Sequence, residues 1–466
     1  MTILKMQLPR TPQPIDSMTI LQVCTSDRSG GAEKAAYDLY LSSRLKGHQA
    51  FLAVGKKTID DDHIIEIDNN SDRNLWARFW RRHQQRLYRQ NRPRSARLCG
   101  WPANLSELDR WLDWQRGYED FDYPGSRRLL SLPTSAPDIV HMHNLHGNYF
   151  DLREVATISQ HVPVFVTLHD EWLLTGHCSS TFGCERWETG CGECPHLATY
   201  PGLKRDGTRR NLAVRSRIYQ ASRLHICSPS GWLLDRANRS VLKSSIVDSR
   251  VISPGVDLSV FQPGDRAKSR LSLGIPPNET VFLYLANNAR QNPSKDFSTI
   301  EQTLQLIASA AIPEGITFLI IGMEGRSERS GEVTIRYSGY QSDPVKVATF
   351  YQSADVFLHA ARAENFPYTI IEALCCGVPV VATAVGGIPE QITDGFNGFL
   401  VPPRDSAAMA ARAIELLYHR DLRRQISAQA AANARKKYDL NRQTAEYLRL
   451  YEQALLRPTT PDTGQA

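Results

Sequence analysis

The chain has 466 residues, enough for two or three domains with sizeable hydrophobic cores, and 41% of its residues are hydrophobic. Gly and Pro are near background levels, which excludes collagen-like and broadly disordered chains. No apolar run approaches about 18 residues, so no transmembrane helix is expected, and the start lacks the continuous apolar core of a secretory signal. The net charge of +6 includes an Arg excess, which suits phosphates, anionic surfaces or carboxylates as partners.

The first half of the chain predicts a doubly wound α/β domain. Residues 1–16 are polar and Pro-rich, as in a loose tail. Strand patterns occur at 18–24, 49–54, 138–143 and 162–168, and a helix pattern at 32–45. Gly30 and Gly31 form the turn between the first strand and the helix, which is the strand–loop–helix–strand start of such a domain. Residues 60–130 are Arg- and Trp-rich, fit no standard alternation, and indicate an insertion.

The second half follows the same alternation of strands and helices. Strand patterns occur at 281–286, 316–322, 333–339, 354–360 and 379–385, and helix patterns at 369–376, 407–418, 427–437 and 441–456. We therefore expect two doubly wound Rossmann-like domains, 17–247 and 248–439, that face each other across a cleft. The helix at 440–456 is a candidate to cross back to the first domain, and 457–466 is expected to be disordered.

Two glutamates stand at a strand–helix junction in the second half. Glu364 lies in the loop after the strand at 354–360, and Glu372 lies in the helix that follows. Ligands bind at this edge of a doubly wound sheet, where helix N–H groups attract anions and carboxylates accept hydrogen bonds from sugar hydroxyls. By spacing alone, the simpler interpretation is one Glu that favours the helix dipole and a second on a solvated face.

The surrounding sequence, ARAENFPYTIIEALCCGVPVVATAVGGIPE at 361–390, resembles the E-x₇-E region of the retaining sugar-nucleotide glycosyltransferases of family 4, which have the GT-B fold. The resemblance implies that Glu364 contacts the donor sugar and that Glu372 contacts the ribose. It also implies that the backbone of Asn365, Phe366 and Pro367 lies near the sugar and the diphosphate. Further matches in order extend from about residue 230 to 456, including PGVD at 254–257, Gly322 and Gly339.

Cations are also present where the family binds the donor diphosphate. Arg290 and Lys295 have the spacing of the family's Arg and Lys, and a cationic pair on a loop after a strand suits that task. The sequence departs from the family at Pro254, where Asn is usual, and at Asp296, where Gly is usual. Neither departure removes a charge that the mechanism needs, but they leave the donor's base and sugar open.

The first half contributes two further candidates. Gly30 and Gly31 precede a helix, so the backbone there can approach a phosphate, and the resemblance makes this loop the one that faces the donor diphosphate and the acceptor. His169 directly follows a strand, and the resemblance implies that it orients the donor sugar; a capping or core histidine is the simpler alternative. Candidates to line the acceptor pocket, or to act structurally, are His141, His143, Asn144 and His146.

Four cysteines in one stretch suggest a metal. Cys178, Cys184, Cys191 and Cys194 form C-x₅-C-x₆-C-x₂-C, and the final C-x₂-C suits tetrahedral Zn²⁺. The stretch 169–195 resembles a Cys-rich insertion in a subset of family 4 that is linked to exopolysaccharide assembly. We expect a structural zinc loop at 177–196 with no chemical role, because a closed four-ligand site has no open position. His177 and His196 are alternative ligands, and two disulfides or four free thiols are alternative states.

Residues 73–97 contain nine arginines and no acidic residue. These arginines are Arg73, Arg78, Arg81, Arg82, Arg86, Arg89, Arg92, Arg94 and Arg97. Aromatic residues recur among them at helical spacing, and a cationic amphipathic helix of this kind is typical of an anionic membrane surface. A solvated helix whose Trp stripe packs on the domain is an equal alternative. Nucleic-acid binding is the weakest interpretation, because no recognised motif accompanies the charge.

The sequence thus predicts a retaining glycosyltransferase that moves a sugar from a nucleoside diphosphate sugar to a hydroxyl of a glycan or lipid-linked acceptor. The resemblance implies that polysaccharide or glycolipid biosynthesis is the setting and that the chemistry requires no cofactor. A cytoplasmic location, peripheral at the inner face of the membrane, is expected. The alternatives are a nucleotide-sugar epimerase of the same fold and a catalytically degenerate relative that serves as a scaffold or as a nucleic-acid- or membrane-binding protein.

Overall fold

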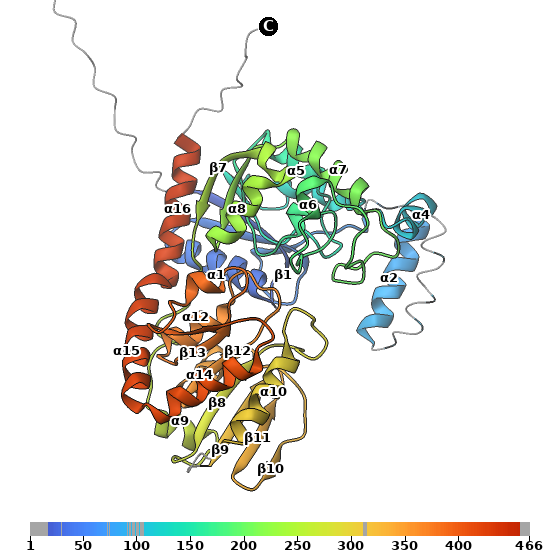
Figure 1. The fold of residues 1–466 in the computed structure, drawn as a ribbon. Helices are drawn as coiled ribbons and strands as arrows, with labels where there is room; N and C mark the ends of the chain where they lie inside the picture. The colour runs from blue at the N-terminus through green and yellow to red at the C-terminus, as the bar shows by residue number, and fades with distance from the viewer. Residues whose placement is uncertain are drawn as a thin grey trace, which may run out of the picture.

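The apolar runs of the sequence become the strands of two parallel sheets in the computed structural model of the chain (Figure 1). The structure describes residues 17–28, 30–71, 107–310 and 315–456, and between 72 and 106 it describes residues 73, 75–90, 92, 95, 98 and 102. The two predicted tails, 1–16 and 457–466, lie outside the described residues. In β9 all six residues are buried, because helices cover both faces of a parallel sheet.

The first sheet has the strand order β3-β2-β1-β4-β5-β6-β7, and all its pairs are parallel. Its strands are β1 (Thr19–Ser26), β2 (Gln49–Lys56), β3 (Ile64–Glu66), β4 (Ile139–Met142), β5 (Val164–Thr167), β6 (Leu224–Ser228) and β7 (Ile246–Val251). The helical segments of this domain are α1 (Gly31–Leu45), η1 (Pro124–Ser131), α5 (Glu154–Ser159), η2 (Trp172–Leu174), α6 (Arg186–Thr189), α7 (Thr208–Gln220), α8 (Gly231–Arg239) and η3 (Val241–Ser245). Within β1, Ile20 pairs with Ala50 on one side and Ile139 on the other, so the order reverses at β1.

The second sheet has the order β10-β11-β9-β8-β12-β13-β14, and only β10 is antiparallel to its neighbour among the described strands. Its strands are β8 (Thr280–Leu285), β9 (Ile316–Ile321), β10 (Glu328–Ser330), β11 (Val333–Ser338), β12 (Val356–His359), β13 (Val380–Thr383) and β14 (Gly398–Val401). Its helices are α9 (Arg266–Ser272), α10 (Phe297–Ala308), α11 (Pro344–Ser353), α12 (Tyr368–Cys375), α13 (Ile388–Gln391), α14 (Ser406–Tyr418) and α15 (Arg420–Lys437). The predicted pair of doubly wound domains is confirmed.

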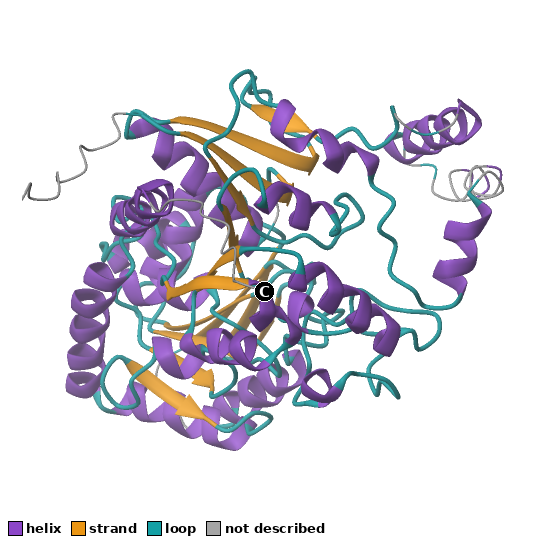
Figure 2. Ribbon diagram, turned by 90° about the horizontal axis from the view of Figure 1, so that it is seen from above, coloured by secondary structure: helices purple, strands orange, loops and turns teal. Residues whose placement is uncertain are grey.

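The predicted insertion is smaller than the sequence suggested. Residues 64–66 form β3, which pairs with β2 and so belongs to the sheet itself. Beyond it, α2 (Leu75–Arg89) and α4 (Leu108–Gln115) stand apart from the rest of the domain in both views (Figures 1 and 2). Among the helices of the described residues, none combines the length and hydropathy that crossing a bilayer requires.

The C-terminal helix α16 (Leu440–Leu456) leaves the second domain and packs against the first, where it runs beside the upper sheet (Figure 1). Its buried face includes Tyr447 and Tyr451, which join the apolar cluster under α1. Tyr451 Oη lies 2.6 Å from His141 Nδ1, and Tyr447 Oη lies 2.8 Å from Thr167 Oγ1. The helix therefore ties the two domains together with a buried polar network as well as apolar contact.

We predict that Tyr451→Ala lowers the free energy of unfolding by about 3 kcal/mol, because it leaves a cavity and removes one of the two hydrogen-bond partners of buried His141. Urea denaturation followed by circular dichroism would measure the change. Arg449→Ala, an exposed substitution on the same helix, serves as the control and is expected to change stability by less than about 0.5 kcal/mol. Equal stabilities of the two variants would contradict the packing role of α16.

Candidate functional site

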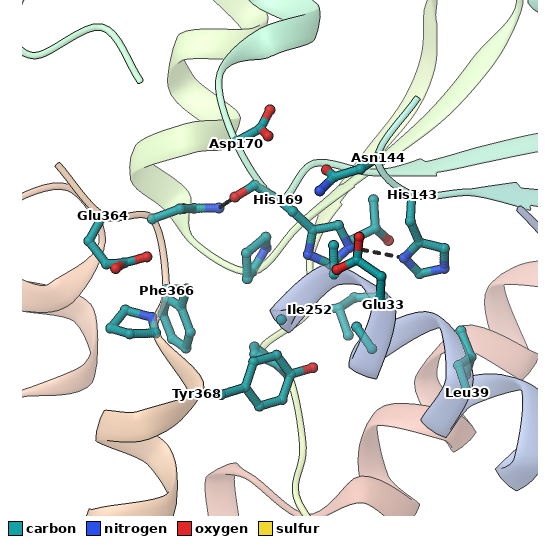
Figure 3. A pocket seen from close by; sticks show the side chains of 18 of the residues that line it. Glu33, Leu39, His143, Asn144, His169, Asp170, Ile252, Glu364, Phe366 and Tyr368 are labelled. Carbon is teal, nitrogen blue, oxygen red and sulfur yellow. Dashed lines mark hydrogen bonds between the residues drawn. The ribbon is translucent and has the colours of Figure 1, made fainter. Parts of the chain in front are cut away.

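A cavity of about 350 Å³ lies between the two domains, where the carboxyl ends of their strands face each other (Figure 3). Figure 3 shows Glu33, His143 and His169 of the first domain on one side and Glu364, Phe366 and Tyr368 of the second on the other. A neighbouring cavity of about 380 Å³ shares part of this lining. The shared residues are His169, Asp170, Lys295, Glu364 and Asn365, so the two cavities form one interdomain cleft.

Glu364 lies at the centre of this cleft and forms an ion pair with Lys295. Burial alone would raise the pKa of the Glu364 carboxyl, but the Lys295 charge and the neighbouring His359 hold it below its usual value of 4.5. Burial lowers the pKa of His359 to about 4. Glu364 is therefore an ionised hydrogen-bond acceptor at neutral pH, which is the state that binds sugar hydroxyls.

The loop that carries Glu364 packs directly against the backbone of two glycines. Gly386 has a φ of 56°, and a Cβ there would lie 1.8 Å from the carbonyl oxygen of Glu364. A Cβ on Gly387 would lie 2.2 Å from the carbonyl oxygen of Asn365. Gly386 and Gly387 thus carry no Cβ because the Glu364 loop rests directly on their backbone.

Asn365 connects the two domains at this point. Its Nδ2 donates to the carbonyl oxygens of Leu168 and His169 at 3.4 and 3.3 Å, and its Oδ1 accepts from Ser230 Oγ at 2.6 Å. Nearby, Glu390 of the second domain accepts hydrogen bonds from the N–H groups of Gly231 and Trp232, both at 2.8 Å. A carboxylate at the N-terminus of α8 is a favourable pairing with the helix dipole.

Glu372 occupies a different environment from Glu364, although both lie on the same motif. It is 7% exposed and accepts a hydrogen bond from Tyr351 Oη at 3.2 Å. Burial raises the pKa of its carboxyl to about 7, although the charge of Lys34, from the first domain, acts to lower it. Glu372 is not among the residues that line the two cavities described above, so its predicted contact with a ribose stays a prediction.

His169 follows β5 and lies in the cleft, in a chain of hydrogen bonds that reaches the sheet core. His169 Nε2 is 2.9 Å from His143 Nδ1, and His143 Nε2 is 2.9 Å from Gln22 Oε1. Burial lowers the pKa of His169 to about 4 and that of His143 well below its usual value, so both rings are neutral at pH 7. With Gln22 Oε1 as the final acceptor, each ring donates from Nε2, and Nδ1 of His169 is its accepting atom.

The glycine turn of the first domain contributes one of its two glycines to the cleft. Gly31 lines the interdomain cavity, and a Cβ there would lie 3.6 Å from the Tyr368 ring. Gly30 is the N-cap of α1, and a Cβ there would lie 2.1 Å from Glu33 Oε2. The Glu33 carboxylate therefore occupies the space beside Gly30, while Gly31 is the glycine that faces the second domain.

Glu33 is a cleft residue that the sequence interpretation missed. It lies in the first turn of α1, near the ion pair between His146 Nε2 and Asp170 Oδ2 at 2.7 Å. Burial raises the pKa of Glu33. Burial alone would lower the pKa of His146, but Asp170 outweighs it and raises that pKa. The sequence could have indicated Glu33 by its position three residues after the N-cap, where a Glu side chain often turns back toward the start of the helix.

Arg290 is not brought together with Lys295. Its guanidinium lies 3.4 Å from Glu301 Oε1 and 3.3 Å from Tyr337 Oη, and it does not line either cavity of the cleft. Glu301 lies on α10, and both side chains of this pair are exposed. The role of Arg290, with Lys295, in a clamp on the donor diphosphate stays a prediction.

The four clustered cysteines form part of a loop beside the second cavity of the cleft, which Ser179 and Ser180 help to line. All four are free thiols, so the two disulfides are not formed here. Cys194 Sγ lies 3.4 Å from His177 Nε2. Within the described part of the chain, no group of three or more His, Cys, Asp and Glu side chains is arranged to hold a metal ion. The zinc site at Cys178, Cys184, Cys191 and Cys194 stays a prediction.

Comparison with known sequences gives partial matches to glycosyltransferases. Residues 265–433 match the family model described as Glycosyl transferases group 1. An Escherichia coli (strain K12) protein with the provisional name colanic acid biosynthesis glycosyl transferase WcaC is 26% identical over 265 residues, which cover 54% of this chain and 60% of that protein. The D-inositol 3-phosphate glycosyltransferase of Segniliparus rotundus is 32% identical over 176 residues, which cover 34% of this chain and 38% of that protein. The chain thus spans 60% or less of the length of these two curated relatives.

Comparison with solved structures covers nearly the whole chain. Sucrose-phosphate synthase from Thermosynechococcus elongatus superposes with a TM-score of 0.60 at 17% identity, covering 94% of this chain and 98% of that one. The Anabaena protein Alr3699/HepE in complex with UDP-glucose gives a TM-score of 0.56 at 17% identity, covering 93% of this chain and all of that one. At these identities the likeness concerns the fold alone, and it confirms that the chain has the GT-B fold.

The two glutamates of the motif are expected to affect stability with opposite pH dependence. The folded-state pKa of Glu372 is raised from 4.5 to about 7, so its stabilising contribution is present at acidic pH and lost as pH rises through 7. As the pH rises from 5 to 8, the free energy of unfolding of Glu372→Gln should therefore increase by on the order of 2 kcal/mol relative to that of the unsubstituted chain. Urea denaturation at several pH values would measure this difference.

Glu364→Gln is the matched comparison. The folded-state pKa of Glu364 is lowered from its usual value of 4.5. Its carboxylate therefore stabilises the folded state above pH 4.5, and this stabilisation is lost as the pH falls through the folded-state pKa. The loss of stability in Glu364→Gln should therefore be largest near neutral pH and smaller in acid. The same sign of pH dependence in both variants would contradict the assigned environments.

Proposed function

We propose that the chain is a retaining glycosyltransferase that transfers a sugar from a nucleoside diphosphate sugar to an acceptor hydroxyl, in polysaccharide or glycolipid biosynthesis. The observation that carries the proposal is the meeting of Glu364, paired with Lys295, and His169 in one interdomain cleft. The match of residues 265–433 to the glycosyl transferases group 1 family supports it. The provisional name of the Escherichia coli relative supports the polysaccharide setting.

In this proposal the ionised Glu364 accepts hydrogen bonds from the donor sugar, and Lys295 neutralises the charge that develops on the diphosphate as it leaves. Arg290 would join Lys295 only by leaving Glu301 and Tyr337, a side-chain rotation at an exposed position. The anionic diphosphate is the attraction that would draw it. The cleft contributes positioning and electrostatics, and the donor phosphate helps to take the acceptor proton.

His169 would act as a neutral hydrogen-bonding group in this cleft. Its pKa of about 4 keeps the ring uncharged at pH 7, and its Nε2–H is used by His143. Its Nδ1 would therefore accept a hydrogen bond from a sugar hydroxyl rather than donate one. Asn365 keeps this ring close to Glu364, because it bonds the backbone of His169 from the adjacent position in the loop.

We predict that Glu364→Gln lowers turnover of the donor by about 100-fold, because a neutral amide replaces the charged acceptor that binds the sugar. A thermal-shift screen of nucleotide sugars would first identify the donor by mass-action stabilisation, and release of the nucleoside diphosphate would then measure turnover. Glu328→Gln, at an exposed position on β10, is the control and should retain full turnover. Near-normal turnover in Glu364→Gln would contradict the proposal.

We also propose that the Arg- and Trp-rich segment, residues 73–97, contacts an anionic membrane surface at the cytoplasmic face. On α2, Leu75, Trp76 and Phe79 are 74%, 56% and 61% exposed, an unusual amount of apolar surface for one helix. Arg82 and Arg86 on the same helix are exposed. Arg73 does not belong to this surface, because it is buried against Glu107 and Asp122. Arg94 and Arg97 lie outside the described residues.

The test of the membrane proposal is co-sedimentation with phosphatidylglycerol vesicles. The combined substitution of Arg78, Arg82 and Arg86 by Gln is expected to weaken binding by at least about tenfold, since each basic residue near such a surface contributes about 1 kcal/mol. The control replaces three exposed arginines of the second domain, Arg326, Arg329 and Arg404, and so removes the same charge. Equal binding by both variants would contradict a specific role for α2.

A further inference from the structure

A second, separate cavity of about 450 Å³ lies between the first domain and its insertion. Its inner wall comes from the segments at the carboxyl ends of β2, β3 and β4, including Glu66 and Tyr149. Its outer wall comes from α2 and α4, including Trp111 and Trp114. The cavity therefore exists only because the insertion stands over the edge of the sheet, and it shares no lining residue with the interdomain cleft.

The cavity and the cleft lie along the same edge of the first sheet. Parallel strands end at one edge, with β1, β4 and β5 facing the cleft and β2 and β3 facing the second cavity. The loop after β4 connects them: Asn144 lines the cleft, Asn148 and Tyr149 line the cavity, and Tyr149 Oη donates to the carbonyl oxygen of Asn144 at 2.6 Å. An extended ligand that starts at the reacting centre could continue along this loop into the cavity.

Ion pairs hold the walls of this cavity in place. Arg73, whose side chain is 5% exposed, pairs with Glu107, whose side chain is 11% exposed, and also lies 2.8 Å from Asp122 Oδ2. Arg110 pairs with Asp120, and Tyr123 Oη lies 3.1 Å from the same carboxylate. These contacts join α4 and Arg73, two residues before α2, to the segment that leads back to the sheet. The cavity is thus a preorganised site rather than a gap beside a loose helix.

The lining combines aromatic faces with carboxylates and amides. Trp111 and Trp114 lie three residues apart on one face of α4, and Trp114 is 48% exposed. Lys204 Nζ lies over the Trp114 ring, 3.6 Å from its centre, and so covers one face of that indole. Flat indole faces suit the apolar faces of sugar rings, while Glu66 and Asn148 offer hydrogen-bonding groups to hydroxyls.

The charge of the lining selects against an anionic ligand. Four carboxylates, those of Glu66, Asp68, Glu107 and Asp120, face two guanidinium groups, those of Arg73 and Arg110. Each guanidinium is already paired with a carboxylate of the same cavity. A phosphate or an acidic sugar would therefore meet repulsion here, whereas a neutral glycan would not.

We propose that this cavity binds a neutral oligosaccharide segment of the acceptor, at a distance from the sugar that receives the transferred unit. The inference rests on the proposed glycosyltransferase function and adds the chemical class of its acceptor. Trp111 and Trp114 stack on the sugar rings, and the carboxylate and amide groups of the inner wall bind their hydroxyls. The insertion is then an acceptor-binding element in addition to any contact with a membrane.

The test measures glycan binding directly, without the donor. Saturation-transfer NMR on the full chain would use four neutral tetrasaccharides, cellotetraose, maltotetraose, laminaritetraose and mannotetraose, at about 10 mM, a range suited to millimolar affinities. At least one is expected to bind, and Trp111→Ala and Trp114→Ala are each expected to weaken its binding by about tenfold or more. Tyr340→Ala, an exposed aromatic of the second domain outside the cavity lining, is the matched control and should bind normally.

Three results would overturn the inference: no binding by any of the four glycans, binding that neither tryptophan substitution weakens, or preferential binding of acidic tetragalacturonate. Thermal unfolding of each variant checks that it is folded, and Trp114→Ala is expected to fold because the residue is half-exposed. Binding of a nucleotide sugar, measured by thermal shift, separates this proposal from the proposed function. Nucleotide-sugar binding with no glycan binding defeats only the cavity, whereas glycan binding with no nucleotide-sugar binding defeats only the glycosyltransferase assignment.

Discussion

The contact that the site depends on is the set of hydrogen bonds through which Asn365 joins the two domains. Parallel sheets place their ligand-binding edges at the ends of strands, so two such domains make one site only if those edges are held face to face. Asn365 bonds the backbone that ends β5 and the serine that caps α8. Glu390 of the second domain accepts hydrogen bonds from the backbone at the start of α8, and α16 packs against the first domain. Because Asn365 adjoins Glu364 in sequence, the contact that closes the domains also fixes the central carboxylate.

The two glutamates of one motif illustrate how environment separates chemically identical groups. Glu364 is half-buried beside Lys295, and the cation outweighs the desolvation, so the carboxyl is ionised. Glu372 is buried beside Tyr351 with Lys34 farther along the interface, and there desolvation dominates. The first is suited to binding hydroxyls in the cleft. The second contributes a carboxyl that titrates near neutral pH at the interface between the domains.

The histidines of the first domain form a buried polar layer between the sheet and the cleft. His141, His143 and His169 stack in sequence, with ring centres 4.5 and 5.2 Å apart, and all three have lowered pKa values through burial. His141 bonds Tyr451 of α16, and His143 bonds His169 in the cleft. The C-terminal helix and the candidate site are therefore adjacent through a short series of neutral rings.

The sequence by itself determined the alternation of strands and helices, because continuous apolar runs and helical spacing are local properties. The resemblance to a known family singled out Glu364, Lys295 and His169, and the structure places all three in the interdomain cleft. The sequence pattern missed β3, β6, β7, β10 and β14, which are short, at sheet edges or only partly apolar. Only the tertiary structure decided which groups meet. It brought Glu33 into the cleft, directed Arg290 toward Glu301, and turned Arg73 inward against Glu107. These outcomes depend on side-chain partners and packing that the pattern of strands and helices does not encode.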